Sequence, residues 1–198
     1  CPELKRRLKK CFSAGKYPLK CKQFRQQETV MSEFKQSFIA SLQRHRDAFA
    51  TVEQYADQAL QLLAAVQDCL AAGGKVVWMG NGGSAADSQH LAAEFMVRYK
   101  AERGPLASIA LTTDTSILTA HANDYHFDSV FERQVRGIVR PQDVVIGLTT
   151  SGKSPNINLA LKAANELGAY TVALTGRDGG LVKDIAKLPI IVKSDETA

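Results

Sequence analysis

Apolar side chains recur at spacings of three and four residues over residues 33–72, a pattern typical of one face of a helix. No proline interrupts this stretch, and Gly73 and Gly74 follow it, as expected just past the end of a helix. Such a length is unusual for one helix of a small domain, so we expect a break near residues 45–51 and a face that packs on another subunit. The apolar positions are Phe34, Phe38, Leu42, Phe49, Val52, Ala56, Ala59, Leu60, Leu63, Val66 and Leu70.

From residue 75 onward the rhythm changes, because short apolar or β-branched runs alternate with helical patterns. Such an alternation predicts a parallel sheet of five strands with helices on both faces. In an open sheet of this kind ligands bind outside the carboxyl ends of the strands, so the loops there are the expected place for chemistry. The expected strands are 75–80, 107–112, 143–149, 170–175 and 188–193, and the expected helices are 84–99, 129–139, 155–167 and 180–187.

The loop after the first expected strand is rich in glycine, because residues 80–85 read GNGGSA and lead into a helix. Glycines let the backbone approach a ligand, and a helix N-terminus offers free N–H groups to an anion. The string also fits the GxGxxA of dinucleotide-binding folds, which need an acidic residue at the end of the second strand about 20 residues on. Glu102 precedes that strand and Asp114 lies too far along, so an anion-binding loop is favoured over a dinucleotide site or a purely structural turn.

A second loop, residues 149–156, reads TTSGKSPN and follows the third expected strand. We expect Ser154 to be the N-cap of the next helix and Pro155 to be its first residue. Hydroxyls, free N–H groups and the helix dipole together make a good phosphate site. Plain capping is the alternative, but four hydroxyls exceed what one cap requires. The spacing does not match the P-loop pattern.

His90 and Glu94 are four residues apart on the expected helix that follows the glycine loop, so they share one face. A histidine and a carboxylate placed in this way can hold a metal ion or pair a base with an orienting group. An exposed ion pair is the commoner meaning of such spacing. The nearby glycine loop favours the functional interpretation.

Asn123 and Asp124, flanked by His121 and His126, fall in the expected loop after the second strand. They therefore belong to the predicted ligand edge of the sheet. These residue types also form turns, so a purely local role is the alternative.

The charge of the chain is divided unevenly. Residues 1–30 hold nine Lys or Arg against two Glu, so that the remainder carries −2 of the total +5. Residues 31–198 therefore offer no basic face for nucleic acid. Met31 looks like the start of a new protein, and residues 1–30 are a basic arm, a solvated tail or a stretch not native to the folded protein.

Cysteine use and hydropathy point to the cytoplasm. Only Cys69 lies in the body of the chain, no CxxC occurs, and no secretory signal is visible. No run of 18 apolar residues occurs, so we expect no membrane span.

Four segments of the chain together resemble the sugar isomerase (SIS) domain family, and within it the phosphoheptose isomerase branch. They are GNGGSAADSQHLAAEF, ALTTDTSILTAHANDY, GLTTSGKSPNINLALKAA and VALTGRDGG. The resemblance covers residues 31–198 and implies an α/β fold, a three-layer αβα sandwich with N-terminal helices in a subunit interface. It also implies a cytoplasmic homotetramer that interconverts sedoheptulose 7-phosphate and D-glycero-D-manno-heptose 7-phosphate, a precursor of lipopolysaccharide heptose.

The resemblance assigns roles to individual residues. It makes Glu94 the catalytic base, and His90 with Glu94 a zinc-binding pair. In most of the family the phosphate loop begins with serine where this chain has Thr149, and asparagine is common where it has Lys153. The substrate contacts that it implies are Asn81, Gly82, Gly83, Glu94, Asn123, Asp124, Thr149, Thr150, Ser151 and Ser154.

One departure concerns the end of the chain. Members of the family continue into a helix with a Gln-Glu-x-x-His-like segment, which supplies the remaining zinc ligands and a second catalytic group, a histidine. This sequence stops at Ala198, so we expect a C-terminal helix to be missing and the chain alone to be inactive.

Two other functions fit an SIS domain. One is a non-catalytic adaptor that binds the replication initiator protein, and such adaptors usually lack the acidic residue found here at Glu94. The other is a module that senses a phosphosugar and controls a DNA-binding domain. Residues 1–30 contain no helix-turn-helix pattern that would support it.

Overall fold

The computed structural model describes residues 18–194, with side chains from residue 30 onward. Contacts divide the chain into two units, Cys1–Phe49 and Ala50–Ala198. The expectations for residues 1–17 and for the end of the chain beyond Ser194 lie outside the described residues. No helix among those described has the length and apolar character needed to cross a membrane.

Helix α2 (Pro18–Ala50) makes up the described part of the first unit. It runs through Met31 without interruption, so the secondary structure does not mark the boundary expected at residue 30. Its apolar positions stay open: Phe34 is 67% exposed and Phe38 64%. Because residues four apart lie on one face of a helix, Phe34, Phe38 and Leu42 form an exposed apolar row.

The second unit opens with a short 3-10 helix, η1 (Val52–Tyr55), followed by α3 (Ala56–Ala71). The long helix of the sequence pattern is thus broken at Thr51, within the expected interval 45–51, of which residues 45–50 remain helical. Val66 and Cys69 on α3 are buried against the sheet, whereas Leu60 and Leu63 are exposed.

A five-stranded parallel sheet forms the centre of the second unit, in the order β2-β1-β3-β4-β5. The expected strands are confirmed to within about two residues, except that the second is shorter. The neighbouring strands β1 and β3 are almost wholly buried because helices cover both faces of the sheet. The strands are β1 (Val76–Gly80), β2 (Ser108–Ala110), β3 (Val144–Thr149), β4 (Tyr170–Gly176) and β5 (Leu188–Val192).

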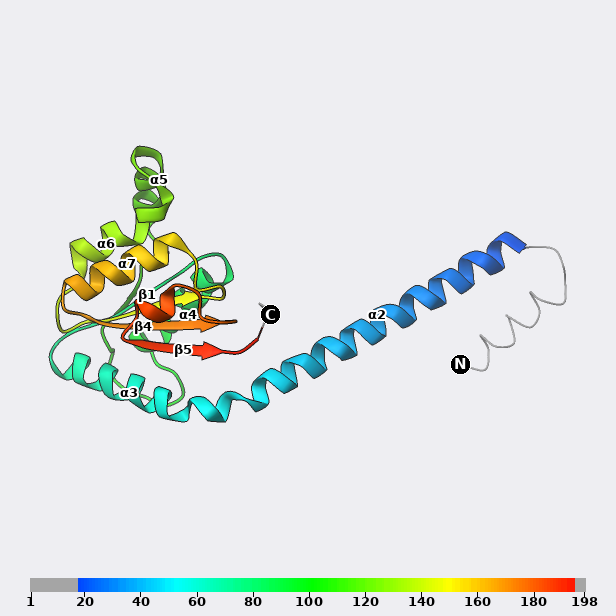
Figure 1. The fold of residues 1–198 in the computed structure, drawn as a ribbon, viewed down its shortest axis with the longest axis horizontal. Coiled ribbons are helices and arrows are strands. Elements are labelled where there is room, and N and C mark those ends of the chain that lie inside the picture. Colours follow the sequence, from blue (N-terminus) through cyan, green and yellow to red (C-terminus); the bar gives the residue numbers. More distant parts are fainter. Residues whose placement is uncertain (1–17, 195–198) are drawn as a thin grey trace. The chain divides into compact units, whose positions relative to one another are not determined.

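Two helical layers pack on the two faces of this sheet and confirm the three-layer αβα fold (Figure 1). On one face α3 and α4 (Gly83–Met96) bury Cys69 and Ala92 with Trp78 and Ile146 of the strands. On the other face lie α6 (Val130–Ile138) and α7 (Pro155–Glu166). The strand order reverses between β1 and β3, so α4 and α7 leave neighbouring strands toward opposite faces.

Two segments differ from the sequence prediction. Residues 115–124, which we expected to be loop, form α5 (Thr115–Asp124), and Asp114 caps it by accepting the Ile117 N–H at 2.9 Å. The helix expected over 180–187 is wrong, because only the 3-10 helix η3 (Val182–Asp184) forms there. Another 3-10 helix, η2 (Phe127–Ser129), leads into α6.

Candidate functional site

A cavity of about 340 Å³ opens at the carboxyl ends of β3, β4 and β5, beside the start of α4. This is the edge at which the sequence predicted ligand binding, and it adjoins the point where the strand order reverses. The cavity brings the two predicted loops together, because both contribute to its wall. Its lining residues are Ser84, Leu148, Thr149, Thr150, Leu174, Thr175, Gly176, Arg177, Ile190, Val192 and Ser194.

In the loop 149–154 the carbonyl groups bond to the end of β4 and to the segment that follows it, which leaves the amide groups facing away from that segment and free to bind a ligand. The carbonyl of Gly152 accepts the N–H groups of Leu181 and Val182, each at 3.0 Å, and that of Thr150 accepts the Gly176 N–H at 3.2 Å. Within the described part of the chain, the amides of Ser151, Gly152, Ser154, Asn156 and Ile157 have no hydrogen-bond partner. The loop and the first turn of α7 thus present a set of free N–H groups, as an anion site requires.

Close backbone contact fixes this loop against the turn after β4. Gly152 has φ of +65°, and a Cβ placed there would lie 2.0 Å from the carbonyl oxygen of Gly179. On the other side of the contact Gly180 has φ of +50°, and its Cβ would lie 2.5 Å from the carbonyl oxygen of Ser151. Only glycine fits at either position.

The hydroxyl groups of the loop are arranged for a ligand more than for capping. Ser154 holds the N-cap position of α7 and Pro155 opens the helix, as expected, but the Ser154 side chain caps no amide. It shares a hydrogen bond of 3.2 Å with the buried Thr149 hydroxyl instead. Ser151 accepts the Lys153 N–H at 3.2 Å, and Lys153 itself is exposed.

The glycine loop 80–83 turns tightly into α4. Gly82 has φ of +59° and stands at the N-cap, while a Cβ on Gly80 would lie 2.5 Å from the Ser84 carbonyl oxygen. The amides of Gly82 and Gly83 have no partner among the described residues. Asn81 points its side chain toward α7, where it forms two hydrogen bonds of 2.9 Å with Asn156.

His90 and Glu94 lie together on α4 as predicted, with 3.5 Å between His90 Nε2 and Glu94 Oε1. The His90 side chain is 73% exposed and the Glu94 side chain 29%. Glu94 stands eleven residues beyond Gly83, which places it about 16 Å further along the helix axis. Within one chain this pair is therefore separated from the loop 149–154 and lines no part of the cavity there.

The turn of α4 that carries Glu94 is anchored from outside the helix. Arg103 donates to the Glu94 carbonyl at 2.7 Å and to the Phe95 carbonyl at 2.9 Å, and Leu106 N–H donates to the Phe95 carbonyl at 3.1 Å. Leu106 lies just before β2, so this end of α4 reaches the amino edge of the sheet. The backbone at Glu94 is fixed while its side chain stays partly open.

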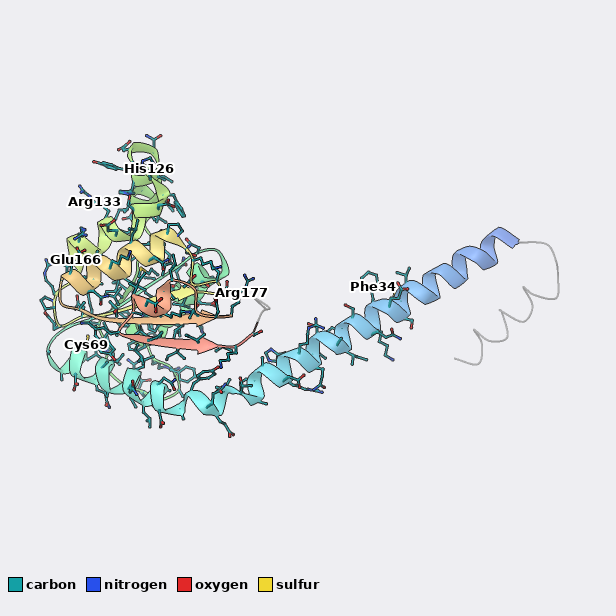
Figure 2. All side chains as sticks on the ribbon, in the orientation of Figure 1. Phe34, Cys69, His126, Arg133, Glu166 and Arg177 are labelled. Carbon is teal, nitrogen blue, oxygen red and sulfur yellow. The ribbon has the colours of Figure 1, made fainter. Side chains whose placement is uncertain are left out.

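Asn123 and Asp124 end helix α5, where they are exposed and joined by a hydrogen bond of 2.9 Å. No contact among the described residues links them to the cavity. The nearby His121 is buried, bonded to Ser129 at 2.8 Å and stacked on the Tyr125 ring at 5.0 Å. Figure 2 shows His126 at this α5 end of the unit and Arg177 at the tips of the strands, well apart.

Thr175 and Arg177 belong to the site although they lie outside the two predicted loops, while Ser84 and Asn156 lie within those loops but had no individual role predicted. Arg177 adopts φ of +54°, which is uncommon for a residue with a side chain, and it brings a positive charge to the cavity wall. The buried hydroxyl of Thr175 has no hydrogen-bond partner among the described residues. The segment VALTGRDGG contained two of these residues, and their place after a strand was the available signal.

The turn after β4 also carries Asp178. The Gly180 N–H donates to its carboxylate at 3.1 Å, and this bond lowers the pKa of Asp178 below its ordinary value. Lys183 and Lys153 lower it further by their charge. Asp178 therefore stays ionised, and its hydrogen bond helps to hold the turn that braces Gly152.

The predicted zinc pair accounts for two donors only. Zinc sites in proteins use three or four protein ligands, and His90 with Glu94 is of the right chemical type. No group of three or more histidine, cysteine, aspartate or glutamate residues suited to a metal occurs within residues described by the structure.

Comparison with known proteins gives consistent matches over most of the chain. The SIS domain family matches residues 37–176. A phosphoheptose isomerase of Aquifex aeolicus is 55% identical over 148 residues, which are 75% of this chain and 78% of that protein.

Two solved structures match the fold and the sequence. The phosphoheptose isomerase of Neisseria gonorrhoeae has a TM-score of 0.71 and 41% identity, over 86% of this chain and 88% of the other. That of Francisella tularensis has a TM-score of 0.75 and 32% identity, over 85% and 88% of the two chains.

Proposed function

This chain belongs to the SIS-domain family, and from that membership we propose that it is a phosphoheptose isomerase. It would interconvert sedoheptulose 7-phosphate and D-glycero-D-manno-heptose 7-phosphate in the cytoplasm, for lipopolysaccharide heptose synthesis. The observation that carries the proposal is the set of free amides and hydroxyls on residues 149–157, at the carboxyl end of β3. This set suits the phosphate that every substrate of such an enzyme shares.

In this proposal the phosphate lies on the loop 149–154 and the first turn of α7. The N–H groups of Ser151 and Gly152 and the hydroxyls of Thr150 and Ser154 hold its oxygens, while Lys153 adds a positive charge nearby. Binding energy from this end is remote from the reacting carbons, so it can be used to hold C1 and C2 in place. The amides of the glycine loop are available to the sugar.

The reaction transfers one proton between neighbouring carbons. A base removes the proton from C1 of the ketose, the electron pair forms the C1–C2 double bond of an enediol, and the O2 oxygen gains a proton. The same base then returns a proton to C2, while the O1 hydroxyl loses its proton as the C1 carbonyl forms. We assign the base to Glu94, since the resemblance names it and its carboxylate is partly open to solvent.

The zinc assignment also belongs to this proposal. His90 and Glu94 would provide two of the ligands, and the shared face and 3.5 Å separation of their side chains support this. When bound, zinc supplies Lewis-acid polarisation of the sugar oxygens.

Glu94 lies about 16 Å along α4 from Gly83 and lines no part of the cavity beside the loop 149–154, which suggests how the site is completed. We propose that Glu94 of one copy serves the phosphate loop of another, within a homotetramer. The exposed apolar row of α2 and the exposed Leu60 and Leu63 of α3 are suited to such association, because apolar surface of this extent favours burial. Asn123 and Asp124, exposed at the end of α5, could then also reach a substrate held by a neighbouring copy.

Conversion of sedoheptulose 7-phosphate by the native protein tests the proposal. In deuterium oxide, NMR should show formation of the aldose, with deuterium at C2 whenever the base exchanges its proton before returning it. Sedoheptulose without phosphate should react far more slowly. Binding of the sugar phosphate without turnover would favour the sensing module, and capture of replication initiator protein without sugar binding would favour the adaptor.

Mixed copies test the shared site. Copies with Glu94→Gln and copies with Thr150→Val and Ser154→Ala should each be nearly inactive alone. Co-expressed, they should regain measurable turnover, because some sites would combine an intact loop with an intact Glu94. Mixtures as inactive as the parents would contradict a site shared in this way.

A further inference from the structure

The side chains of Asn81 and Asn156 form a closed pair across the candidate site. Asn81 Nδ2 donates to Asn156 Oδ1, and Asn156 Nδ2 donates to Asn81 Oδ1, both at 2.9 Å. Asn156 is 2% exposed whereas Asn81 is exposed, so the two hydrogen bonds are shielded from water on the Asn156 side. A buried amide needs such partners, because an unsatisfied one is costly.

The pair joins the two loops that leave the sheet on opposite faces. Asn81 follows β1 in the glycine loop before α4, and Asn156 lies in the first turn of α7, directly after the loop 149–154. The two residues are 75 positions apart in the chain and meet only because β1 and β3 are neighbours. Their hydrogen bonds therefore fix the distance between the glycine loop and the start of α7.

The phosphate loop does not depend on this pair for its own shape. Its carbonyls are bonded to Gly176, Leu181 and Val182, and Gly152 packs against Gly179 on the side of the β4–β5 turn. The glycine loop is held by the helix that follows it, because the carbonyls of Asn81 and Gly82 accept the N–H groups of Ser84 and Ala85, each at 3.1 Å, while the amides of Gly82 and Gly83 have no partner in the described structure. Loss of the pair should therefore move the glycine loop and leave the phosphate loop in place.

We infer that Asn156 is a positioning residue, which acts through Asn81 to hold the glycine loop in register with the bound phosphate. This inference rests on the proposed isomerase function for its kinetic consequence. Asn156 sets where the sugar end of the substrate lies, while the phosphate itself is gripped by other groups. Its loss should lower kcat and leave the affinity for phosphate nearly unchanged.

Asn156→Asp is the sharpest test because it preserves size and removes a donor. The new carboxylate can still accept from Asn81 Nδ2, but it faces the Asn81 carbonyl oxygen with no hydrogen to share. We expect kcat for sedoheptulose 7-phosphate to fall about tenfold or more, the scale of one to two lost hydrogen bonds. In Asn156→Ser, which breaks the pair without adding a negative charge beside the phosphate, the dissociation constant for inorganic phosphate should change less than about threefold.

A double-mutant cycle separates positioning from general stability. In an Asn81→Ala background, Asn156→Asp should have little further effect on kcat, because the hydrogen bonds between the two side chains are already absent. Asn165→Asp is the matched control: it lies on the same helix and also donates and accepts, to Ile185 and from Thr171. It should lower the melting temperature similarly and leave kcat unchanged.

An NMR measurement of phosphate binding, which needs no turnover, separates the inference about Asn156 from the proposed isomerase function. In native protein, inorganic phosphate should shift the NMR amide signals of residues 81–84 as well as those of 150–157. In Asn156→Asp, or in Asn156→Ser if the first variant folds poorly, only the second set should shift. If the native protein binds phosphate but does not convert the sugar, the isomerase proposal fails and these shifts alone decide the inference.

Three results would overturn the inference. They are an unchanged kcat in a folded Asn156 variant, a phosphate affinity of Asn156→Ser that falls in proportion to its kcat, and additive effects of the two substitutions in the cycle.

Discussion

The loop at residues 149–154 is braced by backbone contacts, whereas the His90–Glu94 pair stands on an open helix face at the other edge of the sheet. In the first region carbonyls bond to the β4–β5 turn and amides remain free. In the second the backbone is anchored by Arg103, but the imidazole is mostly solvated. In the proposed function, one chain thus completes the phosphate-binding part of the site and leaves the proton-transfer part open, so affinity and turnover should respond to different substitutions.

The largest expected effect concerns the open region. Glu94→Gln in the native protein should lower kcat by about 100-fold to 10,000-fold, the usual contribution of a general base, while the substrate still binds. Steady-state kinetics and calorimetric titration measure the two quantities. Glu102→Gln removes the same charge from an exposed carboxylate and should leave kcat unchanged. Near-normal turnover in Glu94→Gln would exclude Glu94 as the base.

A substitution in the loop 149–154 should change the affinity for phosphate. Gly152→Ala places a methyl group 2.0 Å from the Gly179 carbonyl oxygen at a position with positive φ, so the loop must shift. We expect phosphate binding to weaken by about tenfold or more and unfolding to become easier by about 1–3 kcal/mol. Gly137→Ala in α6, where a Cβ meets no atom within 4 Å, is the control and should be neutral or slightly stabilising. Unaltered phosphate affinity in Gly152→Ala would argue against this loop as the anion site.

The contribution of Arg103, which holds the backbone at Glu94, can be tested separately. Arg103→Ala removes charged hydrogen bonds to the Glu94 and Phe95 carbonyls and should lower the free energy of unfolding by about 1.5–3 kcal/mol. Arg98→Ala removes only an exposed ion pair of 3.6 Å with Glu102, worth less than about 1 kcal/mol. Urea titration of both variants compares the two arginines, and equal losses would contradict the role given to Arg103.

The smallest effect involves Cys69, which Figure 2 labels on α3. Burial raises the pKa of the Cys69 thiol above its ordinary value of 9.0. The stability linked to this shift is present below pH 9 and is lost as the pH rises through the raised pKa. Iodoacetamide at pH 8 should label Cys69 about tenfold more slowly in native than in urea-unfolded protein, as followed by peptide mass spectrometry. Equal labelling rates in native and unfolded protein would show that the Cys69 thiol is accessible to solvent in the native protein.

The sequence predicted what local patterns determine and missed what depends on distant contacts. Strands and the loop 149–154 followed from apolar runs and hydroxyl density, which are local. Helix 180–187 failed because Gly179 and Gly180 take positive φ to pack against Gly152, a requirement set by another loop. Helix α5 was missed because its last turn is made of residues that also form turns.

The candidate site was likewise predictable in part. Residue types and spacing indicated the anion loop and the His90–Glu94 pair, and the structure brings the members of each together. The pairing of Asn81 with Asn156 could not be predicted, since it depends on β1 lying next to β3. The separation of about 16 Å between Gly83 and Glu94 could have been calculated from helix rise alone, because both residues lie on α4.

The contact between Gly152 and Gly179 has a consequence for how such a protein can change over time. Two loops whose backbones touch cannot lengthen or drift independently, since an insertion in one would displace the other. With the phosphate held by this loop as proposed, variants that accept a longer or differently shaped sugar should carry their changes on the α4 or α5 side and keep the loop 149–154 unchanged.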